Sequence, residues 1–489
     1  MQKYQEFAAN PELALRCTQI DENNYSATGI TSYRNVFMSD RDRILYCKSF
    51  LRMSGKTQVY APSKGDHQRT RLTHTLEVSQ IARTISKALG LDQDLTEAIA
   101  LGHDIGHTPF GHAGERMLHE IMSPTNDRDA QTPKSTTIYK LTNSDSQQEY
   151  QELYGFKHNL QSVRATIEDL ESKSQSHGLD LCNYTLWGIA HHSSTKYAVG
   201  RVTTDFVDPQ FYQRYEKYWQ RADGTEAWTF EAFVVAEADE IAQMHHDLED
   251  AIRSKAVSID TVLDLVGMLK EFMQPDDRKS YDELQIDTRS KEYLISSVSK
   301  ILVNTLVTKL IGASETNFGF LRAKFRDVYQ MLTLDISKDE NKFLKYAIGY
   351  DLLREKEMKF TERGKVEKFQ KQLSNSVLFT YDVQRTDSKG KYIIKNLFEA
   401  YYTNPQQLPD SALKNMYNAL KKEGYAFTIT DEYYKIDSSK LRVVIDEAIK
   451  AIRRKRDIKM DICVMRIICD YIAGMTDSFA ISEYEKLYG

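Results

Sequence analysis

The segment from 101 to 115, LGHDIGHTPFGHAGE, places three histidines, an aspartate and a glutamate among four glycines. Imidazole nitrogens and carboxylate oxygens are ligands for ions such as Mn²⁺, Fe, Mg²⁺ and Zn²⁺, and histidine also exchanges protons near neutral pH. Glycine is unfavourable inside helices, so this density indicates a turn where backbone and ligand approach each other closely. The alternative is a glycine-rich connection between two helices in which the histidines are incidental.

His103 and Asp104 are the strongest candidates for metal ligands. Adjacent side chains leave a helix about 100° apart, so both can reach one ion that lies beside the end of a helix. Two ligands do not make a tight site. His74 and Asp239 are candidates for completing it, because two histidines and two aspartates would leave open positions for water and substrate. Taken alone, His74 also fits a structural histidine, and Asp239 fits one more acid on a solvated helix face.

The elements that must position these residues are mostly helices. Apolar residues recur every three or four positions in the segments 69–91 and 230–252, which predicts two amphipathic helices. Further helices are expected at 157–170 and 182–192, within 290–370, and from 440 onward. The polar stretch 123–150 is expected to be a loop or an insertion, and 376–397 a short hairpin or a charged loop. The predicted fold class is mainly α, with at most a little β.

Composition excludes several classes of protein. The 489 residues carry a net charge of −5, unlike a strongly basic nucleic-acid binder. The five cysteines are scattered without a CxxC pair, which argues against a disulfide framework or a zinc cage. We find no signal peptide and no apolar stretch of eighteen residues, and therefore expect a cytoplasmic protein without a membrane partner.

Several motifs together resemble a known family. They occur in the order DRDRILYCKSFLRMSGKTQVY (40–60), RTRLTHTLEVSQIART (69–84), LGHDIGHTPFGHAGE (101–115), FKHNLQSVR (156–164), EADEIAQMHHDLEDAI (237–252), KNLFEAYYTNPQQLPD (395–410) and CDYIAGMTDSFA (469–480). From about residue 40 to the C-terminus the chain resembles the bacterial deoxyguanosine-triphosphate triphosphohydrolases of the HD superfamily. The resemblance implies an HD-domain helical core with helical N- and C-terminal extensions. We expect an N-terminal segment with pocket residues at 1–65, the core at 66–255 and a helical region packed on it at 256–489.

The resemblance also implies a reaction and a cofactor. Family members hydrolyse a deoxynucleoside triphosphate, here most simply dGTP, to the deoxynucleoside and tripolyphosphate. They use one divalent metal, expected to be Mn²⁺ or Mg²⁺, with Fe, Co and Zn also compatible with the ligand types. The implied ligands are His74, His103, Asp104 and Asp239. Family members form tetramers or hexamers, so a homo-oligomer is expected.

This reaction expels the 5′-oxygen of the sugar, which is a poor leaving group and needs an acid to protonate it. His112 is the expected acid. Glu115 lies three residues later and would stand beside it on a helix, where a carboxylate favours and orients the imidazolium. Both match the catalytic pair of the family by position. His107 lies one helical turn after His103, and is expected to bind phosphate or to support Asp104.

Three positively charged side chains are expected to bind the triphosphate. Arg71 lies three residues before His74, on the same helix face, and matches a phosphate contact of the family. Its planar guanidinium suits phosphate oxygens. Arg52 and Lys56, in the segment FLRMSGKTQ, are expected to line the same pocket.

Three further residues are expected to contact the nucleoside. Asp247 follows Asp239 by eight residues, about 12 Å along a helix, and its family counterpart accepts a hydrogen bond from the 3′-hydroxyl. Gln58 matches a residue that contacts the sugar or the base. Family members often carry tyrosine at position 243, where this chain has Gln243. This departure leaves the sugar and base preferences open.

Two other functions remain open at this point. The first is another HD phosphohydrolase, acting on cyclic dinucleotides, guanosine tetraphosphate or other nucleotides. The second is a non-catalytic scaffold that senses nucleotides or binds single-stranded DNA, for which the basic run 451–459 is a candidate surface. The same run is also a candidate contact for an allosteric nucleotide, although a solvated helix face is the slightly favoured explanation.

Overall fold

The computed structural model describes residues 3–22, 33–58, 69–122, 155–168, 178–192, 214–253, 257–286, 290–352, 361–378, 380–427 and 437–489. Across these ranges the chain forms α-helices, short 3-10 helices and isolated β-bridges, with no strand. The prediction of a mainly α fold is confirmed. The polar stretch 123–150 lies outside the described residues.

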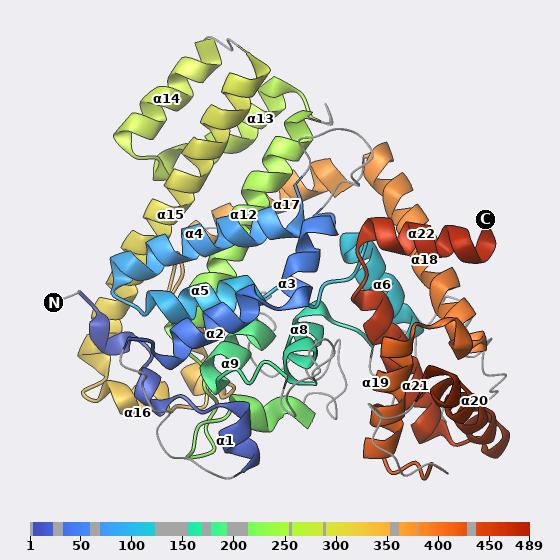
Figure 1. Ribbon diagram of the computed structural model, residues 1–489. Coiled ribbons are helices and arrows are strands. Elements are labelled where there is room, and N and C mark those ends of the chain that lie inside the picture. The colour runs from blue at the N-terminus through green and yellow to red at the C-terminus, as the bar shows by residue number, and fades with distance from the viewer. Residues whose placement is uncertain are drawn as a thin grey trace.

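Two helices, α4 (Arg71–Leu89) and α12 (Phe230–Arg253), pack against each other at the centre of the first half of the chain (Figure 1). The hydroxyl of Thr70 caps the start of α4, which ends at Gly90 with a positive φ of 77°. Around this pair lie α5 (Gln93–Gly102), α6 (Gly111–Ile121), α8 (His158–Ile167) and α9 (Asn183–His191). The helices expected from apolar periodicity are therefore present, with small shifts at their ends.

The described helices share two hydrophobic cores. The first joins the central pair to α1 (Cys17–Asp21), α2 (Val36–Leu45), α3 (Lys48–Arg52), α13 (Ile259–Gly267), α14 (Pro275–Ile286), α15 (Lys291–Lys324), α16 (Val328–Leu332) and α17 (Glu362–Leu378). The second joins part of α6 to α18 (Tyr381–Thr403), α19 (Asp410–Lys422), α20 (Ser438–Lys455), α21 (Ile458–Ala473) and α22 (Asp477–Tyr488). The expected region 256–489 contributes to both cores, with α13 to α17 in the first and α18 to α22 in the second.

The segment 376–397 was expected to be a hairpin or a charged loop, and this prediction is wrong. Most of it belongs to α18, which packs against α6. Ile393, Ile394, Leu397 and Phe398 are buried in the second core at helical spacing. Burial of this stripe outweighs the local preference of its β-branched and aromatic residues for strands.

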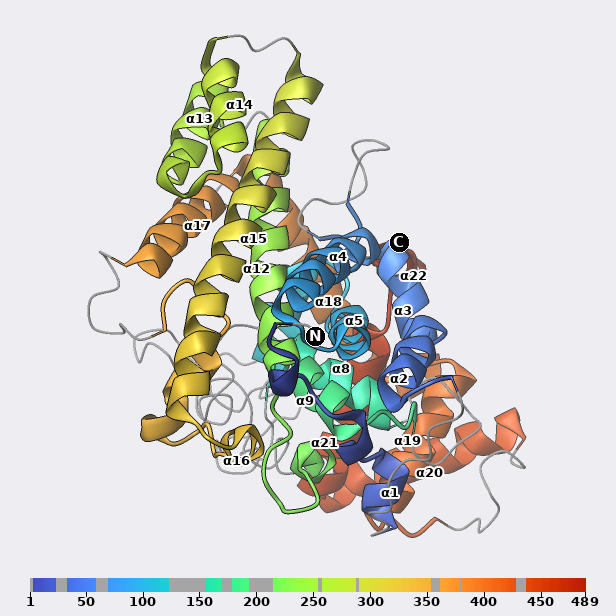
Figure 2. The same ribbon diagram turned by 90° about the vertical axis from the view of Figure 1, so that its left-hand side faces the viewer.

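The helix α15 is long and apolar enough, by length and composition alone, to cross a membrane, with a mean hydropathy of 1.5 in its most apolar window. The sequence analysis did not recognise this stretch. Half of that window is buried inside the protein, and α15 packs against α12, α14 and α4 (Figure 2). This is the pattern of a core helix rather than a membrane span.

Candidate metal centre and active site

The middle of the glycine-rich segment, residues 103–110, forms the loop that joins α5 to α6. His103 and Asp104 directly follow the last residue of α5, and the loop packs against α8 through Ser162. The amide of Gly106 donates to the Ser162 hydroxyl oxygen over 2.9 Å, and that hydroxyl donates to the carbonyl of His103 over 2.8 Å. A Cβ atom at Gly106 would lie 2.1 Å from the amide nitrogen of Ser162, so only glycine allows this approach.

The four predicted metal ligands converge from α4, the loop and α12. The nitrogen His74 Nε2 lies 2.9 Å from Asp239 Oδ1, and His103 Nε2 lies 3.7 Å from Asp104 Oδ2 and 3.9 Å from Asp239 Oδ1. Ligands held about 2.1 Å from one ion lie about 3.0–4.2 Å apart for bond angles of 90–180°. The observed separations are close to this range, so one divalent ion fits among the four side chains.

The protonation pattern of His103 also fits a metal ligand. Its Nδ1 lies 2.6 Å from the carbonyl of Ala100 and must carry the proton, because a carbonyl only accepts. Its Nε2 then presents a lone pair to the cluster. This nitrogen is buried and has no hydrogen-bond partner among the residues that the structure describes. A buried, unpaired acceptor is costly unless a cation satisfies it.

A fifth side chain, His192, stands at the same cluster. It directly follows α9, and its Nδ1 lies 2.8 Å from the carbonyl of Ile189, which leaves Nε2 facing the site. Together with His103 and Asp239 it forms a group close enough to share an ion. Burial, with a further contribution from neighbouring histidines, lowers the pKa of His192 to about 3, so the ring is neutral at pH 7. The sequence analysis did not single out this residue.

Arg71 and Asp104 form a buried ion pair at the edge of the cluster. Burial opposes ionisation of Asp104, but Arg71 and the adjacent histidines outweigh it and hold the pKa of Asp104 well below its usual range. The Nε and Nη2 atoms of Arg71 are buried and have no hydrogen-bond partner in the described part of the chain. These donors are therefore available to an anionic group that enters beside the cluster.

The predicted acid, His112, lies near the start of α6 and is half exposed. Its Nδ1 is 3.3 Å from Glu115 Oε2, and both residues come from the same face of α6. The other oxygen of Glu115 accepts the amide of His158 over 3.1 Å and lies 2.9 Å from His158 Nδ1. Burial raises the pKa of Glu115, but His158, His112 and Lys157 outweigh it and hold this pKa well below the ordinary value. Glu115 is thus an anion that anchors two histidines.

His158 contacts both the cluster of predicted metal ligands and Glu115 of the acid pair. Its Nε2 is 3.8 Å from Asp104 Oδ1 and 3.4 Å from His192 Nε2. The ring of His107 stacks on it, with centroids 4.7 Å apart, and lies 5.4 Å from the ring of His112. Burial, then the charge of Arg71, lowers the pKa of His107 well below the ordinary value. The motif FKHNLQSVR contains His158, but the sequence analysis did not recognise its histidine as a site residue.

The residues predicted to bind the nucleoside lie on α12 and beside the start of α6. Asp247 is buried on α12, and its Oδ2 accepts a hydrogen bond from the Ser374 hydroxyl over 3.4 Å. Burial, then the charge of Asp250, raises the pKa of Asp247 to about 7. The backbone of Gln58 lies beside Gly111 at the start of α6. Gln243 lies on α12 between the two predicted aspartates, and no described contact assigns it a role.

Lys56, predicted to line the substrate pocket, lies between the glycine-rich loop and α21. Its ammonium is buried and donates to the carbonyls of His107 and, over 2.9 Å, Ala473. Burial, followed by the charges of Arg52 and Arg71, lowers the pKa of Lys56 to about 7. The structure therefore gives Lys56 a role in joining the glycine-rich loop to α21.

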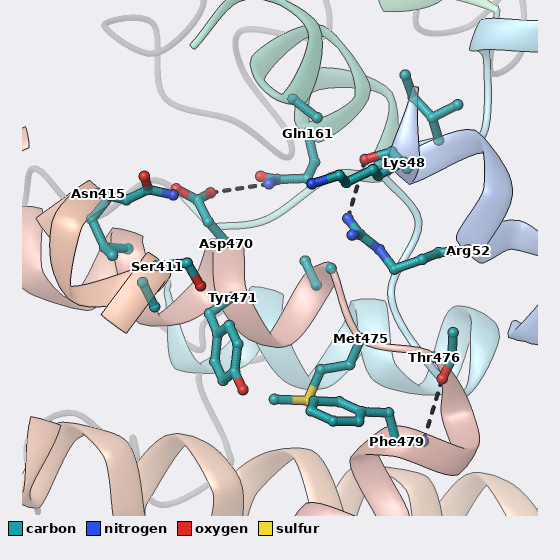
Figure 3. A pocket seen from close by; sticks show the side chains of 18 residues that line it. Lys48, Arg52, Gln161, Ser411, Asn415, Asp470, Tyr471, Met475, Thr476 and Phe479 are labelled. Atoms are coloured by element: carbon teal, nitrogen blue, oxygen red, sulfur yellow. Dashed lines mark hydrogen bonds between the residues drawn. The ribbon is translucent and has the colours of Figure 1, made fainter. Parts of the chain in front are cut away.

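Arg52 lines a cavity of about 510 Å³ where α3, α8, α19 and α21 meet (Figure 3). One guanidinium nitrogen donates to the Ser49 hydroxyl over 3.3 Å. Across the cavity Gln161 donates to Asp470 over 3.0 Å. Ile105 and Gly106 of the glycine-rich loop also line this cavity, and none of the predicted metal ligands does.

Comparisons with known proteins show which families the chain resembles. The HD domain family matches residues 71–244, and the phosphohydrolase-associated domain matches residues 357–448 and 450–486. A deoxyguanosinetriphosphate triphosphohydrolase-like protein of Rickettsia bellii is 31% identical over 469 residues, which cover 94% of this chain and 92% of the relative. Proteins of the same description from Geobacter sulfurreducens and Clostridium tetani are 30% and 35% identical over 457 and 317 residues. These alignments cover 93% and 64% of this chain, and 89% and 72% of those relatives. The chain belongs to the deoxyguanosinetriphosphate triphosphohydrolase-like family of HD-domain phosphohydrolases.

Proposed function

We propose that the protein hydrolyses deoxynucleoside triphosphates, dGTP foremost, to the deoxynucleoside and tripolyphosphate. The observation that carries this proposal is the position of the His112–Glu115 pair next to a buried cluster of histidines and aspartates. The pair offers a proton near the cluster, and Arg71 offers free donors to a phosphate. These are the groups that hydrolysis at an α-phosphorus requires.

Each residue has a defined part in the proposed reaction. The oxygen of a water molecule forms a bond to the α-phosphorus while the bond from phosphorus to the 5′-oxygen breaks. His112 donates its proton to the departing 5′-oxygen, and Glu115 holds the imidazole in place. Arg71 binds a phosphate oxygen through the nitrogens that Asp104 does not engage.

A divalent ion held by His74, His103, Asp104 and Asp239 would supply Lewis acidity at the α-phosphate and favour deprotonation of the attacking water. Mixed imidazole and carboxylate ligands suit Mn²⁺ or Mg²⁺, and also accept Fe, Co or Zn. His192 is close enough to act as an additional ligand. We propose a cytoplasmic enzyme that works as a homo-oligomer, as the resemblance implies.

The test is to incubate the purified protein with each of the four dNTPs and with GTP in the presence of Mn²⁺, and to separate the products by ion-exchange chromatography. The expected products are deoxyguanosine and tripolyphosphate in equal amounts. Pyrophosphate or orthophosphate as the first product would show that a different bond is cut and would overturn the proposal. Cleavage of cyclic dinucleotides or guanosine tetraphosphate with no turnover of any dNTP would favour another HD phosphohydrolase.

A further inference from the structure

A second pair of residues, Glu77 and His246, lies behind His74 on the side away from Asp239. Glu77 follows His74 by three residues, which places both on one face of α4. His246 follows Asp239 by seven residues, two turns later on α12. The ring of His74 therefore has Asp239 at its Nε2 edge, 2.9 Å away, and His246 at its Nδ1 edge, 3.2 Å away.

The contacts form a chain of hydrogen bonds with a defined direction. His246 Nε2 is in direct contact with Glu77 Oε2, and a carboxylate can only accept, so this nitrogen carries a proton. A neutral imidazole has one N–H, so His246 Nδ1 is an acceptor. The nitrogen that faces it, His74 Nδ1, must then be the donor.

This direction of hydrogen-bond donation determines which nitrogen of His74 keeps an available lone pair. With its proton on Nδ1, His74 presents the lone pair of Nε2 to an oxygen of Asp239 that also only accepts. A cation that contacts both atoms would satisfy them, as at a metal site. We propose that Glu77 and His246 are positioning residues that hold His74 in its metal-binding tautomer. The inference rests on the metal-dependent function proposed above and extends it to two residues outside the predicted ligand set.

The surroundings of Glu77 support this role. Arg69 Nη2 lies 3.5 Å from its Oε1 and 3.0 Å from Glu249 Oε2, which leaves Oε2 of Glu77 for the histidine. His245 Nδ1 is 3.8 Å from the same Oε2 of Glu77, which is beyond hydrogen-bond distance, and its Nε2 is 3.3 Å from Glu249 Oε1. His246 is 1% exposed, so water does not compete for its ring nitrogens.

The residues Glu77, His245 and His246 are also near enough to one another to suggest a separate metal site. Each of the three residues already has partners: His246 pairs with Glu77 and His74, Glu77 also with Arg69, and His245 with Glu249. These contacts account for the group without an ion.

The experiment measures Mn²⁺ binding to the metal-stripped full-length protein by isothermal titration calorimetry, without nucleotide. Glu77→Leu removes the acceptor and should weaken binding by about 10–100-fold. Glu77→Gln keeps an acceptor oxygen and should weaken it by about threefold or less. Glu249→Leu is the matched control, because it removes a neighbouring carboxylate that contacts Arg69 and His245 but not His246.

Two results would overturn the inference. One is wild-type Mn²⁺ affinity in Glu77→Leu, and the other is an equal loss in Glu249→Leu, which would indicate a general effect of the surface. If Glu77→Leu does not fold, His246→Leu compared with His246→Gln serves instead, since the glutamine retains an oxygen that can accept from His74. An equal loss of affinity in those two variants would likewise reject the inference.

A parallel titration of Asp239→Ala separates this inference from the proposed function. Loss of binding in Asp239→Ala together with unchanged binding in Glu77→Leu rejects only the positioning role. Unchanged binding in both variants rejects the metal site itself, and with it the metal-dependent function.

Discussion

Replacement of Asp247 by asparagine should stabilise the protein while weakening its activity. Asp247 is 5% exposed, and the described contact to its carboxylate is a single hydroxyl, that of Ser374. A carboxylate in such a place is costly to ionise. A ligand that brings a hydroxyl to Asp247 would offset part of this cost, as expected for a site built to bind a sugar.

The magnitude follows from the pKa. Burial, then Asp250, raises the pKa of Asp247 from 3.8 to about 7. The folded protein therefore binds more protons than the unfolded chain between these values, and the free energy of unfolding falls as pH rises through this window. The raised pKa of Asp247 lowers the free energy of unfolding by about 2 kcal/mol at pH 5.5 and by about 4 kcal/mol at pH 8. Asparagine does not titrate, so Asp247→Asn should gain about 2 kcal/mol more at pH 8 than at pH 5.5.

Urea unfolding at the two pH values checks this prediction. The exposed Asp276→Asn is the control and should change the free energy of unfolding by less than about 0.5 kcal/mol at either pH. An equal effect of Asp247→Asn at pH 5.5 and pH 8 would show that the raised pKa, and the reasoning from burial, is wrong.

The same variant tests the proposed contact to the 3′-hydroxyl. A hydrogen bond to a charged group contributes about 1.5–3 kcal/mol and one to a neutral group about 1 kcal/mol. The kcat/KM for dGTP should therefore fall about tenfold in Asp247→Asn. With 2′,3′-dideoxyGTP, which lacks the hydroxyl, wild type and variant should differ by less than about threefold. Equal losses on both substrates would remove Asp247 from sugar recognition.

Three further predictions concern the metal and the loop. His112→Ala should bind Mn²⁺ like wild type but lose about 10²–10⁴-fold in kcat, and a wild-type rate would exclude His112 as the acid. Mn²⁺ at a hundred times its Kd should stabilise the wild-type protein by about 2.7 kcal/mol in urea unfolding. The same ion should not stabilise Asp239→Ala, and equal stabilisation would show that this acid is not a ligand. Gly106→Ala should destabilise by about 3 kcal/mol because its Cβ meets the backbone of α8, whereas Gly312→Ala, which meets open space, should not destabilise. A neutral Gly106→Ala would contradict the close packing of the loop.

The sequence predicted the helical fold well because strong apolar stripes, as in α4 and α12, form wherever they can be buried. It failed where packing on a distant element decided the outcome. The stripe in α18 is covered by α6, which lies more than 250 residues earlier in the chain, so the local preference for strands misled the prediction.

The residues of the site also divide into those that local motifs predicted and those that only the folded structure revealed. The predicted ligands and the pair on α6 come from motifs whose residue types indicate their chemistry, and the structure brings their side chains together. His158 and His192 join them from α8 and from the end of α9. The adjacent histidines 191–192, placed at the end of an apolar helix, were the available signal. Their ring nitrogens acquire a direction only from carbonyls that the folded chain supplies.

The glycines of the segment 101–115 allow the close packing that positions the residues of the site. A Cβ at Gly106 would lie 2.1 Å from the backbone of α8, and one at Gly114 would lie 2.1 Å from the carbonyl of Pro109. Gly111 has a φ of 56°, which few other residues adopt. Each glycine costs a helix about 1 kcal/mol relative to alanine, but here it brings the loop against α8 and turns α6 so that Glu115 meets His158. Larger residues at Gly106 or Gly114 should therefore displace the metal cluster or the acid pair, although neither glycine touches an ion or a substrate.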